Sequence, residues 1–126
     1  VGVDWLTMEA SRAPGVHVLG DAVFPAAQMP KSGHMANQHA KLVAAAVIQQ
    51  LKGEPVNPSP VLANTCYSFV TAAEAVHVAT VHQYDAAEKT FKTVPGSGGL
   101  SAAASPMEGR YALGWAENIW ADTLAL

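Results

Sequence analysis

Five histidines and one cysteine are the residues of this chain most suited to binding a metal ion. His34 and His39 are five residues apart, which on a helix is about 140° of rotation, so they would lie on different faces. His77 and His82 are separated by an odd number of residues, so on one strand they would point to opposite sides of the sheet. Neither pair has the i, i+4 spacing of helical zinc ligands. We therefore expect no metal site.

The single cysteine, Cys66, lies within the run Asn64–Ser68, which reads Asn-Thr-Cys-Tyr-Ser. A lone cysteine is more often a small buried apolar residue than a nucleophile. It can form no disulfide within this chain, so any disulfide partner would come from a part of the protein outside this sequence. The residue pattern alone leaves both roles open.

A third chemical feature is the pair Gly20-Asp21, which follows the apolar run Val16–Leu19 and precedes a loop and a helix start. Glycine lets the backbone turn sharply and approach a ligand closely. An aspartate at a strand end can accept hydrogen bonds from sugar-like hydroxyls. The free N–H groups of a helix beginning near Ser32–His34 favour an anionic or electron-rich ligand atom. Together these features are typical of a cofactor site.

The elements that would position these residues are a short strand and a long helix. The run Val16–Leu19 predicts a short buried strand, ended by Gly20-Asp21. Ser32 is a good N-cap, Lys52 complements the helix dipole and Gly53 supplies a stop. The apolar residues at helical spacing that predict the buried face are Ala36, Ala40, Val43, Ala44, Val47, Ile48 and Leu51.

After a proline-rich connection at residues 55–60, the chain becomes rich in β-branched and aromatic residues. Three strands are predicted, at Val61–Val70, Ala75–Tyr84 and Thr90–Val94, with a hairpin loop at Asp85–Glu88. Gly96–Gly99 predicts a flexible turn, and Ala102–Leu126 returns to helical composition. The predicted class is therefore α+β, in which a strand and a long helix are followed by a small antiparallel sheet and a C-terminal helix.

The composition limits the function. A chain of 126 residues has room for one ordinary domain, and a net charge of −3 gives no reason to expect nucleic acid as a partner. The longest run without charged residues, Val56–Ala73, is broken by prolines and asparagines and would be a poor membrane span. The chain begins at Val1 without an initiating Met or a signal peptide, so we expect a fragment or a processed product.

Several of these segments resemble a known family of flavoproteins. Ala13–Ala22 resembles the second flavin-binding motif of the two-dinucleotide-domain flavoproteins, and Met29–Gly33 is similar to the loop of sulfide-oxidising members that approaches the flavin ring. Leu62–Ser68, Val94–Gly99 and the segment around Trp115 resemble the C-terminal domain of the flavoprotein subunit of flavocytochrome c sulfide dehydrogenase.

The resemblance implies FAD as the cofactor and assigns roles to individual residues. Cys66 would be one half of a redox-active cysteine pair, whose partner lies upstream of Val1. The cofactor contacts that it implies are Gly20, Asp21, Lys31, Ser32, Gly33 and Trp115. Asp21 would hold the ribityl hydroxyls, Lys31 and the helix-start amides would lie near the pyrimidine side of the flavin, and Trp115 would form an aromatic wall.

The implied reaction is the two-electron oxidation of sulfide through the cysteine pair and FAD. Electrons would pass to a c-type cytochrome subunit, with its haem on another chain because no Cys-x-x-Cys-His site occurs here. The resemblance also implies a periplasmic location. It implies two domains, the end of an FAD-binding Rossmann-like domain at residues 1–54 and a flavin-binding and interface domain at residues 55–126.

The dinucleotide fingerprint Gly-x-Gly-x-x-Gly is absent, so the ADP half of FAD would bind to an upstream part of the protein and this chain alone would be inactive. Two alternatives remain. A sulfide:quinone oxidoreductase shares the Gly-Asp and Pro-Lys motifs, but Ala112–Leu126 has no Lys or Arg and suits a membrane-contact helix poorly. The second alternative is a non-catalytic docking module for a cytochrome, although such a module would not need Asp21 or Cys66.

Overall fold

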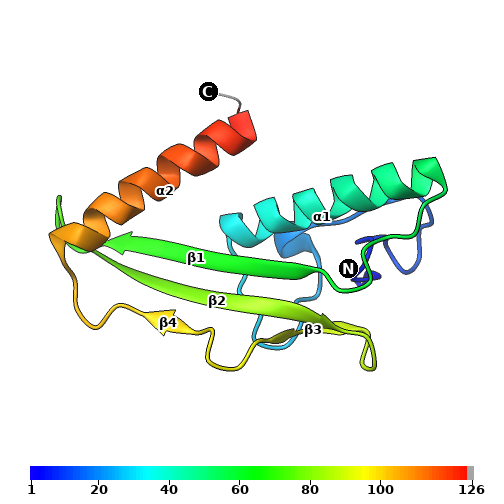
Figure 1. The fold of residues 1–126 in the computed structure, drawn as a ribbon, viewed down its shortest axis with the longest axis horizontal. Coiled ribbons are helices and arrows are strands. Elements are labelled where there is room, and N and C mark those ends of the chain that lie inside the picture. Colours follow the sequence, from blue (N-terminus) through cyan, green and yellow to red (C-terminus); the bar gives the residue numbers. More distant parts are fainter. Residues whose placement is uncertain (125–126) are drawn as a thin grey trace.

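The computed structural model describes residues 1–124 and contains two long helices and one four-stranded antiparallel sheet. The elements in chain order are a 3₁₀ turn at Gly20–Ala22, α1 at Gly33–Lys52, β1 at Val61–Phe69, β2 at Ala75–Asp85, β3 at Thr90–Thr93, β4 at Gly99–Leu100 and α2 at Pro106–Leu124. The predicted α+β class is confirmed, and both helices lie over the same side of the sheet (Figure 1).

The sheet is built around β2, which pairs with β1 on one side and with both β3 and β4 on the other. The predicted β2–β3 hairpin is confirmed, and its loop is held by Asp85, whose Oδ1 accepts the backbone N–H groups of Ala87 and Glu88. β4 is a fourth strand that the sequence did not predict. It has only two residues, and its pairing with Val78 and Ala79 of β2 is non-local.

Helix α1 begins and ends at the predicted residues. The Ser32 hydroxyl accepts the Met35 N–H at 3.0 Å, which satisfies one of the N–H groups left free at a helix start. Gly53 has a left-handed φ of 71° and donates its N–H to the last turn. The start signal at Ser32 and the stop signal at Gly53, both predicted from the sequence, are confirmed.

The helix also covers the free edge of β1. The Thr65 N–H of this strand donates to His34 Nδ1 at 2.9 Å, and the Ala63 N–H donates to Gln38 Oε1 at 3.5 Å. His34 and Gln38 are four residues apart on α1, and Ala63 and Thr65 are two apart on β1, so one helix face matches one strand edge. Side chains of α1 thereby take the place of a neighbouring strand.

The predicted face of α1 is only partly correct, since Val43 packs against the core but most of the other predicted residues do not. The buried residues are Met35, His39, Leu42 and Ala46, whereas Ile48 and Leu51 are 52% and 82% exposed. Ala40 and Ala44 of the predicted face are also exposed. Apolar residues occur on more than one side of this helix, so their spacing alone could not decide which side packs against the rest of the chain.

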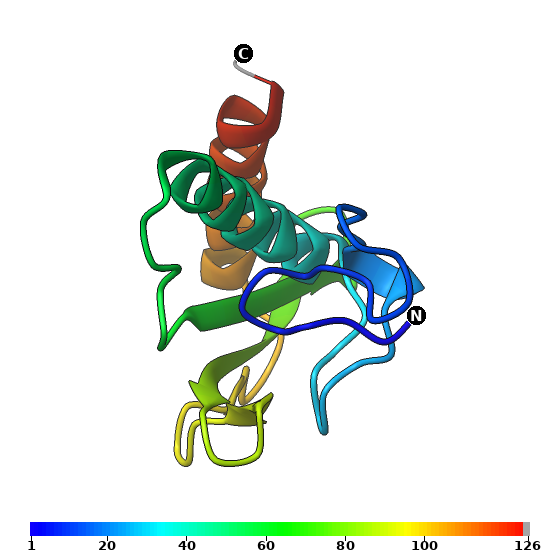
Figure 2. The same cartoon turned by 90° about the vertical axis from the view of Figure 1, so that its right-hand side faces the viewer.

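The core lies between α1, the N-terminal segment and one end of the sheet. Its buried residues are Met8, Val23, Ala26, Met29, Met35, Leu42, Leu62 and Phe91. The N-terminal segment packs beside α1 and above the sheet (Figure 2). Members of this core come from both sides of the predicted boundary at residues 54 and 55, and the division into two domains stays a prediction.

The strand predicted at Val16–Leu19 is also wrong. The segment makes a single bridge, between Glu9 and His17, and leaves Val16 50% exposed. A strand needs a neighbouring strand to pair with, and within residues 1–124 the hydrogen bonds of this segment go to nearby loop residues between 7 and 13. The Gly20-Asp21 pair follows it as a 3₁₀ turn.

Helix α2 crosses the far end of the sheet and then rises toward the start of α1 (Figure 1). Near its beginning Gly109 packs so closely on the Ala73 carbonyl that a side chain there would overlap it. Near its end Asp122 forms an ion pair with Lys41 at 2.9 Å and accepts a hydrogen bond from Asn37 at 3.1 Å. The residues Ala125 and Leu126, included in the predicted helical segment, lie outside the described part.

Candidate functional site

A cavity of about 610 Å³ lies where the start of α1, the middle of β1 and the second half of α2 meet. Its lining includes the N-cap Ser32 with Gly33 and His34 from α1, Thr65, Cys66 and Tyr67 from β1, and Trp115, Ile119 and Trp120 from α2. The fold therefore brings together four of the predicted site residues, namely Ser32, Gly33, Cys66 and Trp115. They come from three elements that are far apart in the sequence.

Cys66 is partly exposed in this cavity and is linked to the helix start through one buried side chain. Asn64, 2% exposed, accepts a hydrogen bond from the Ser32 hydroxyl at 2.5 Å through Oδ1. The same amide contacts the sulfur through both of its polar atoms, since Nδ2 lies 3.6 Å and Oδ1 lies 3.7 Å from Cys66 Sγ. The amide can therefore donate to a charged sulfur or accept from a thiol, because an asparagine side chain carries both a donor and an acceptor.

Three aromatic rings form one wall of the cavity. The Trp115 ring makes an edge contact with His34 at 5.5 Å and a tilted contact with Tyr67 at 5.8 Å between centroids. Burial lowers the pKa of His34 from its usual value, and its Nδ1 accepts the Thr65 N–H, so the neutral ring carries its proton on Nε2. The indole N–H of Trp115 is buried and has no hydrogen-bond partner within residues 1–124.

This wall is held on the sheet by a polar cluster behind it. His77 Nδ1 lies 2.8 Å from Glu108 Oε2 and 2.9 Å from Ser101 Oγ, and the Tyr67 ring packs against His77 at 5.8 Å. The hydrogen bond from His77 lowers the pKa of Glu108. Because Glu108 lies on α2 and His77 on β2, the cluster fixes the helix that carries Trp115.

The remaining predicted residues form a second group beside the N-terminal half of α1. Gly20 has a left-handed φ of 64° and lies so close to Ala36 that an added Cβ would sit 3.0 Å from the alanine Cβ. Its N–H donates to His39 Nδ1 at 3.1 Å, and Lys31 Nζ donates to the Asp21 carbonyl at 3.1 Å. The Asp21 carboxylate is exposed and makes no hydrogen bond within residues 1–124.

The structure does not bring Gly20, Asp21 and Lys31 into the cavity of Cys66. They line a separate and much smaller cavity, which shares no lining residue with the first. Both groups nevertheless meet at this helix, the first through Ser32 and the second through Ala36. An elongated ligand could contact both groups, whereas a small one would touch one of them.

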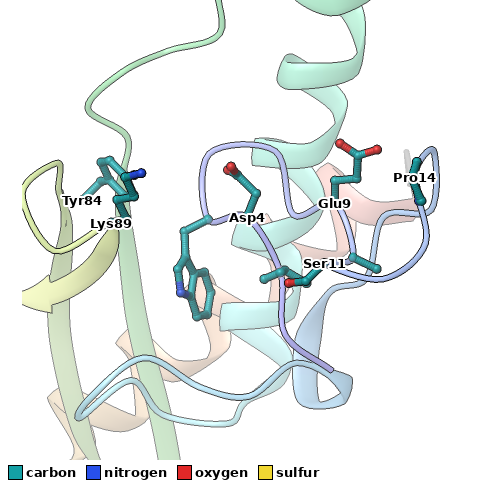
Figure 3. A pocket seen from close by; sticks show the side chains of 9 residues that line it. Asp4, Glu9, Ser11, Pro14, Tyr84 and Lys89 are labelled. Atoms are coloured by element: carbon teal, nitrogen blue, oxygen red, sulfur yellow. The ribbon is translucent and has the colours of Figure 1, made fainter.

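Another cavity, of about 550 Å³, lies apart from all the predicted site residues. Figure 3 shows Tyr84 and Lys89 of the hairpin on one side of it and residues of the N-terminal loop on the other. The two carboxylates that line it are hydrogen-bonded to the backbone of the N-terminal loop. Asp4 Oδ1 accepts the Leu6 N–H at 2.8 Å, and Glu9 Oε1 accepts the Gly15 N–H at 2.6 Å. We therefore place the candidate site at Cys66.

Within residues 1–124, no three His, Cys, Asp or Glu side chains gather closely enough to hold a metal ion. His34 faces the Cys66 cavity and His39 faces the core, as their spacing predicted. No helix among the described residues has the length and apolar character needed to cross a membrane.

The comparison with known families decides the identity of this arrangement. Residues 58–124 match the model of a family described as flavocytochrome c sulphide dehydrogenase, flavin-binding. The chain belongs to this family. The match contains β1 with Cys66 and α2 with Trp115, and it confirms the resemblance identified from the sequence. A flavin is therefore the cofactor of this domain.

The residues present fit such a cofactor. The cavity wall is mainly apolar and aromatic, which suits a planar ring system, and the buried Trp115 N–H is a donor without a partner in the described part. The first turn of α1 directs backbone N–H groups toward this end of the cavity and favours negative charge there. Asp21 lies outside this cavity, and its carboxylate is exposed.

Asn64, His34 and Tyr67 are site residues that the sequence did not single out. Asn64 and Tyr67 flank Cys66 within the motif Asn-Thr-Cys-Tyr-Ser, so the motif itself was the available signal. No local signal marks His34, because its role depends on the edge of β1 and on Trp115 being brought to it by the fold.

Proposed function

We propose that this chain forms one wall of the active site of an FAD-dependent sulfide dehydrogenase, with Cys66 as one half of a redox-active cysteine pair. The observation that carries the proposal is that the only cysteine opens into the same cavity as the start of α1 and Trp115. A buried structural cysteine would need neither that position nor the amide of Asn64 beside it.

In the proposed reaction, hydrosulfide attacks the disulfide between Cys66 and a second cysteine supplied by another part of the protein. A bond forms between the incoming sulfur and one cysteine sulfur, the original S–S bond breaks, and the other cysteine leaves as a thiolate. The Asn64 amide stabilises negative charge on Cys66 Sγ in this step. The bound flavin supplies a two-electron acceptor for this chemistry.

The chain's other residues would hold and orient the cofactor. Trp115 and Tyr67 provide an aromatic surface, and the N–H groups at Gly33 and His34 favour the electron-rich edge of the ring. Asp21 would bind the ribityl hydroxyls. Lys31 donates to the Asp21 carbonyl and lies outside the Cys66 cavity, so we propose that it lies beside these hydroxyls and not near the pyrimidine side. Most of the ADP site would come from outside this sequence.

A c-type cytochrome is the proposed electron acceptor, in keeping with the family's name. We propose the periplasm as the location, because a disulfide that must be oxidised in each cycle persists in an oxidising compartment. The haem would lie on the cytochrome, since this sequence has no attachment motif for one.

The test is sulfide-dependent reduction of a c-type cytochrome by the full-length flavoprotein. The variant Cys66→Ser should lose at least about a hundredfold in turnover while retaining FAD, because serine cannot enter a disulfide or a persulfide. Ser68→Ala is the matched control, since Ser68 lies two residues further along β1 and is exposed. Turnover by Cys66→Ser equal to that of the control would refute the proposal.

A further inference from the structure

The Gly20-Asp21 turn is anchored at its backbone, and one of its anchors is a side chain with no assigned role. Lys31 holds the Asp21 carbonyl at 3.1 Å, and the turn packs against Ala36 of α1. The third anchor is His39 of α1, whose Nδ1 accepts the Gly20 N–H at 3.1 Å. These contacts leave the Asp21 carboxylate exposed.

His39 is one of the most deeply buried side chains of the chain, 2% exposed, and its ring packs 5.9 Å from that of Trp5. Burial lowers its pKa to about 4, so the ring is neutral near pH 7. Since Nδ1 accepts a hydrogen bond, the proton resides on Nε2, which is buried without a partner within residues 1–124.

An unpaired buried donor destabilises a folded protein, and an apolar side chain of similar size would fill the same space without that cost. Within residues 1–124, the hydrogen bond that His39 makes is the one that its Nδ1 accepts from the Gly20 N–H. Gly20 is buried, and its N–H points inward to the buried His39 ring. His39 thus fixes the direction in which the following residue, Asp21, leaves the turn.

We propose that His39 is a positioning residue for the flavin, which holds the Gly20 backbone so that the Asp21 carboxylate faces the ribityl hydroxyls. The inference rests on the proposed function of Asp21 and adds the group that orients it. His39 itself touches no ligand in this account, and it acts through one hydrogen bond to the backbone.

The test uses the full-length flavoprotein and two substitutions at position 39. His39→Met fills the space without an acceptor, and His39→Gln restores an oxygen acceptor. In His39→Met, the Gly20 amide proton should exchange with solvent roughly five- to tenfold faster than in the unmodified protein. FAD binding should weaken several-fold, as expected for one lost hydrogen bond. His39→Gln should recover part of both. His82→Met, which removes another buried histidine from β2, is the control and should change neither.

Unchanged Gly20 exchange in His39→Met, or equal effects in His82→Met, would overturn the proposal. Asp21→Asn separates the inference from its basis. Weaker FAD binding in Asp21→Asn with unchanged binding in His39→Met overturns the positioning role alone, whereas unchanged binding in both overturns the assignment of Asp21. In the unmodified protein, nitrogen NMR should find His39 protonated at Nε2, and protonation at Nδ1 would contradict the proposal whether or not the variants fold.

Discussion

Cys66 depends on Asn64 more directly than on any other side chain of the described structure. The Ser32 hydroxyl donates to Asn64 Oδ1 at 2.5 Å, and the same amide lies against the sulfur, with Nδ2 at 3.6 Å and Oδ1 at 3.7 Å from Cys66 Sγ. Ser32 in turn caps α1. The start of the helix and the reactive sulfur are therefore joined through one buried amide, so a change at Asn64 should alter the sulfur's reactivity without removing it.

The variant Asn64→Asp tests this link. A carboxylate at that position disfavours the neighbouring thiolate and cannot donate to it, so alkylation of reduced Cys66 by iodoacetamide at neutral pH should slow about tenfold. Ser68→Ala is again the control and should alkylate at the unmodified rate. Alkylation of Asn64→Asp at that same rate would mean that the amide has no influence on the sulfur.

Among the elements, α2 decides whether the cavity exists, because it carries Trp115. Its attachment to the sheet relies on Gly109, where any side chain would overlap the Ala73 carbonyl. Gly109→Ala should destabilise the docking of α2 and lower FAD content, with a loss of roughly 2–3 kcal/mol in unfolding free energy. Gly114→Ala is the matched control, since no neighbouring atom lies within 4 Å and alanine favours a helix. Equal stability of the two variants in urea titrations would contradict this account.

The other end of α2 is fastened by Asp122, whose hydrogen bonds to Lys41 and Asn37 lower its pKa. A carboxylate with a lowered folded pKa stabilises the fold above its ordinary pKa and loses that contribution as the pH falls through the folded value. Asp122→Asn should therefore lower the protection of α2 amides against exchange at neutral pH, in the second half of the helix. The loss of this protection on acidification, expected in the unmodified protein, should be absent in the variant.

Glu88→Gln provides the comparison for Asp122→Asn, because it breaks an ion pair to Lys92 on the distant hairpin. Its α2 exchange should match that of the unmodified protein. If Asp122→Asn also matches it, the ion pair to Lys41 does not fasten the helix. The effect on global stability should be small in both variants, since exposed ion pairs contribute little.

For the whole molecule, two buried neutral histidines make the fold sensitive to acid. Burial lowers the pKa of His39 to about 4 and also lowers that of His82. Since the unfolded chain binds their protons near pH 6.5, stability is full above that pH and falls as the pH drops toward 4. His39 alone accounts for on the order of 3 kcal/mol of this loss.

This share is measured by urea unfolding of the unmodified protein and of His39→Met between pH 7 and pH 4. The unmodified protein should lose stability more steeply, because the variant lacks the buried group. The other titrating groups contribute equally to both proteins and cancel in the difference. Parallel curves would show that His39 is not held neutral by burial.

The sequence predicted those parts of the fold that depend on local chemistry. Ser32 and Gly53 set the ends of α1, and β-branched residues set the three longer strands. Features that depend on distant partners were missed or wrong. Within residues 1–124, Val16–Leu19 has no strand to pair with, and the buried side of α1 is determined by the core rather than by apolar spacing.

The candidate site also has features that the sequence predicted and features that depend on the fold. Cys66, Trp115 and the Gly20-Asp21 pair were identified through motifs, whereas their separation into two groups on α1 depends on the fold. Asn64 was visible within the motif around Cys66, but its orientation toward Ser32 requires a contact between residues 32 positions apart. No spacing rule predicts such a contact.

The most direct test of the central claim is the anaerobic addition of sulfide to the full-length flavoprotein without an electron acceptor. The visible flavin absorbance of the unmodified protein should be lost rapidly as sulfide is oxidised. Cys66→Ser should keep its flavin absorbance after sulfide is added and lose it normally when dithionite is added. Rapid loss with sulfide in Cys66→Ser would contradict the claim that Cys66 receives the electrons of sulfide beside the flavin.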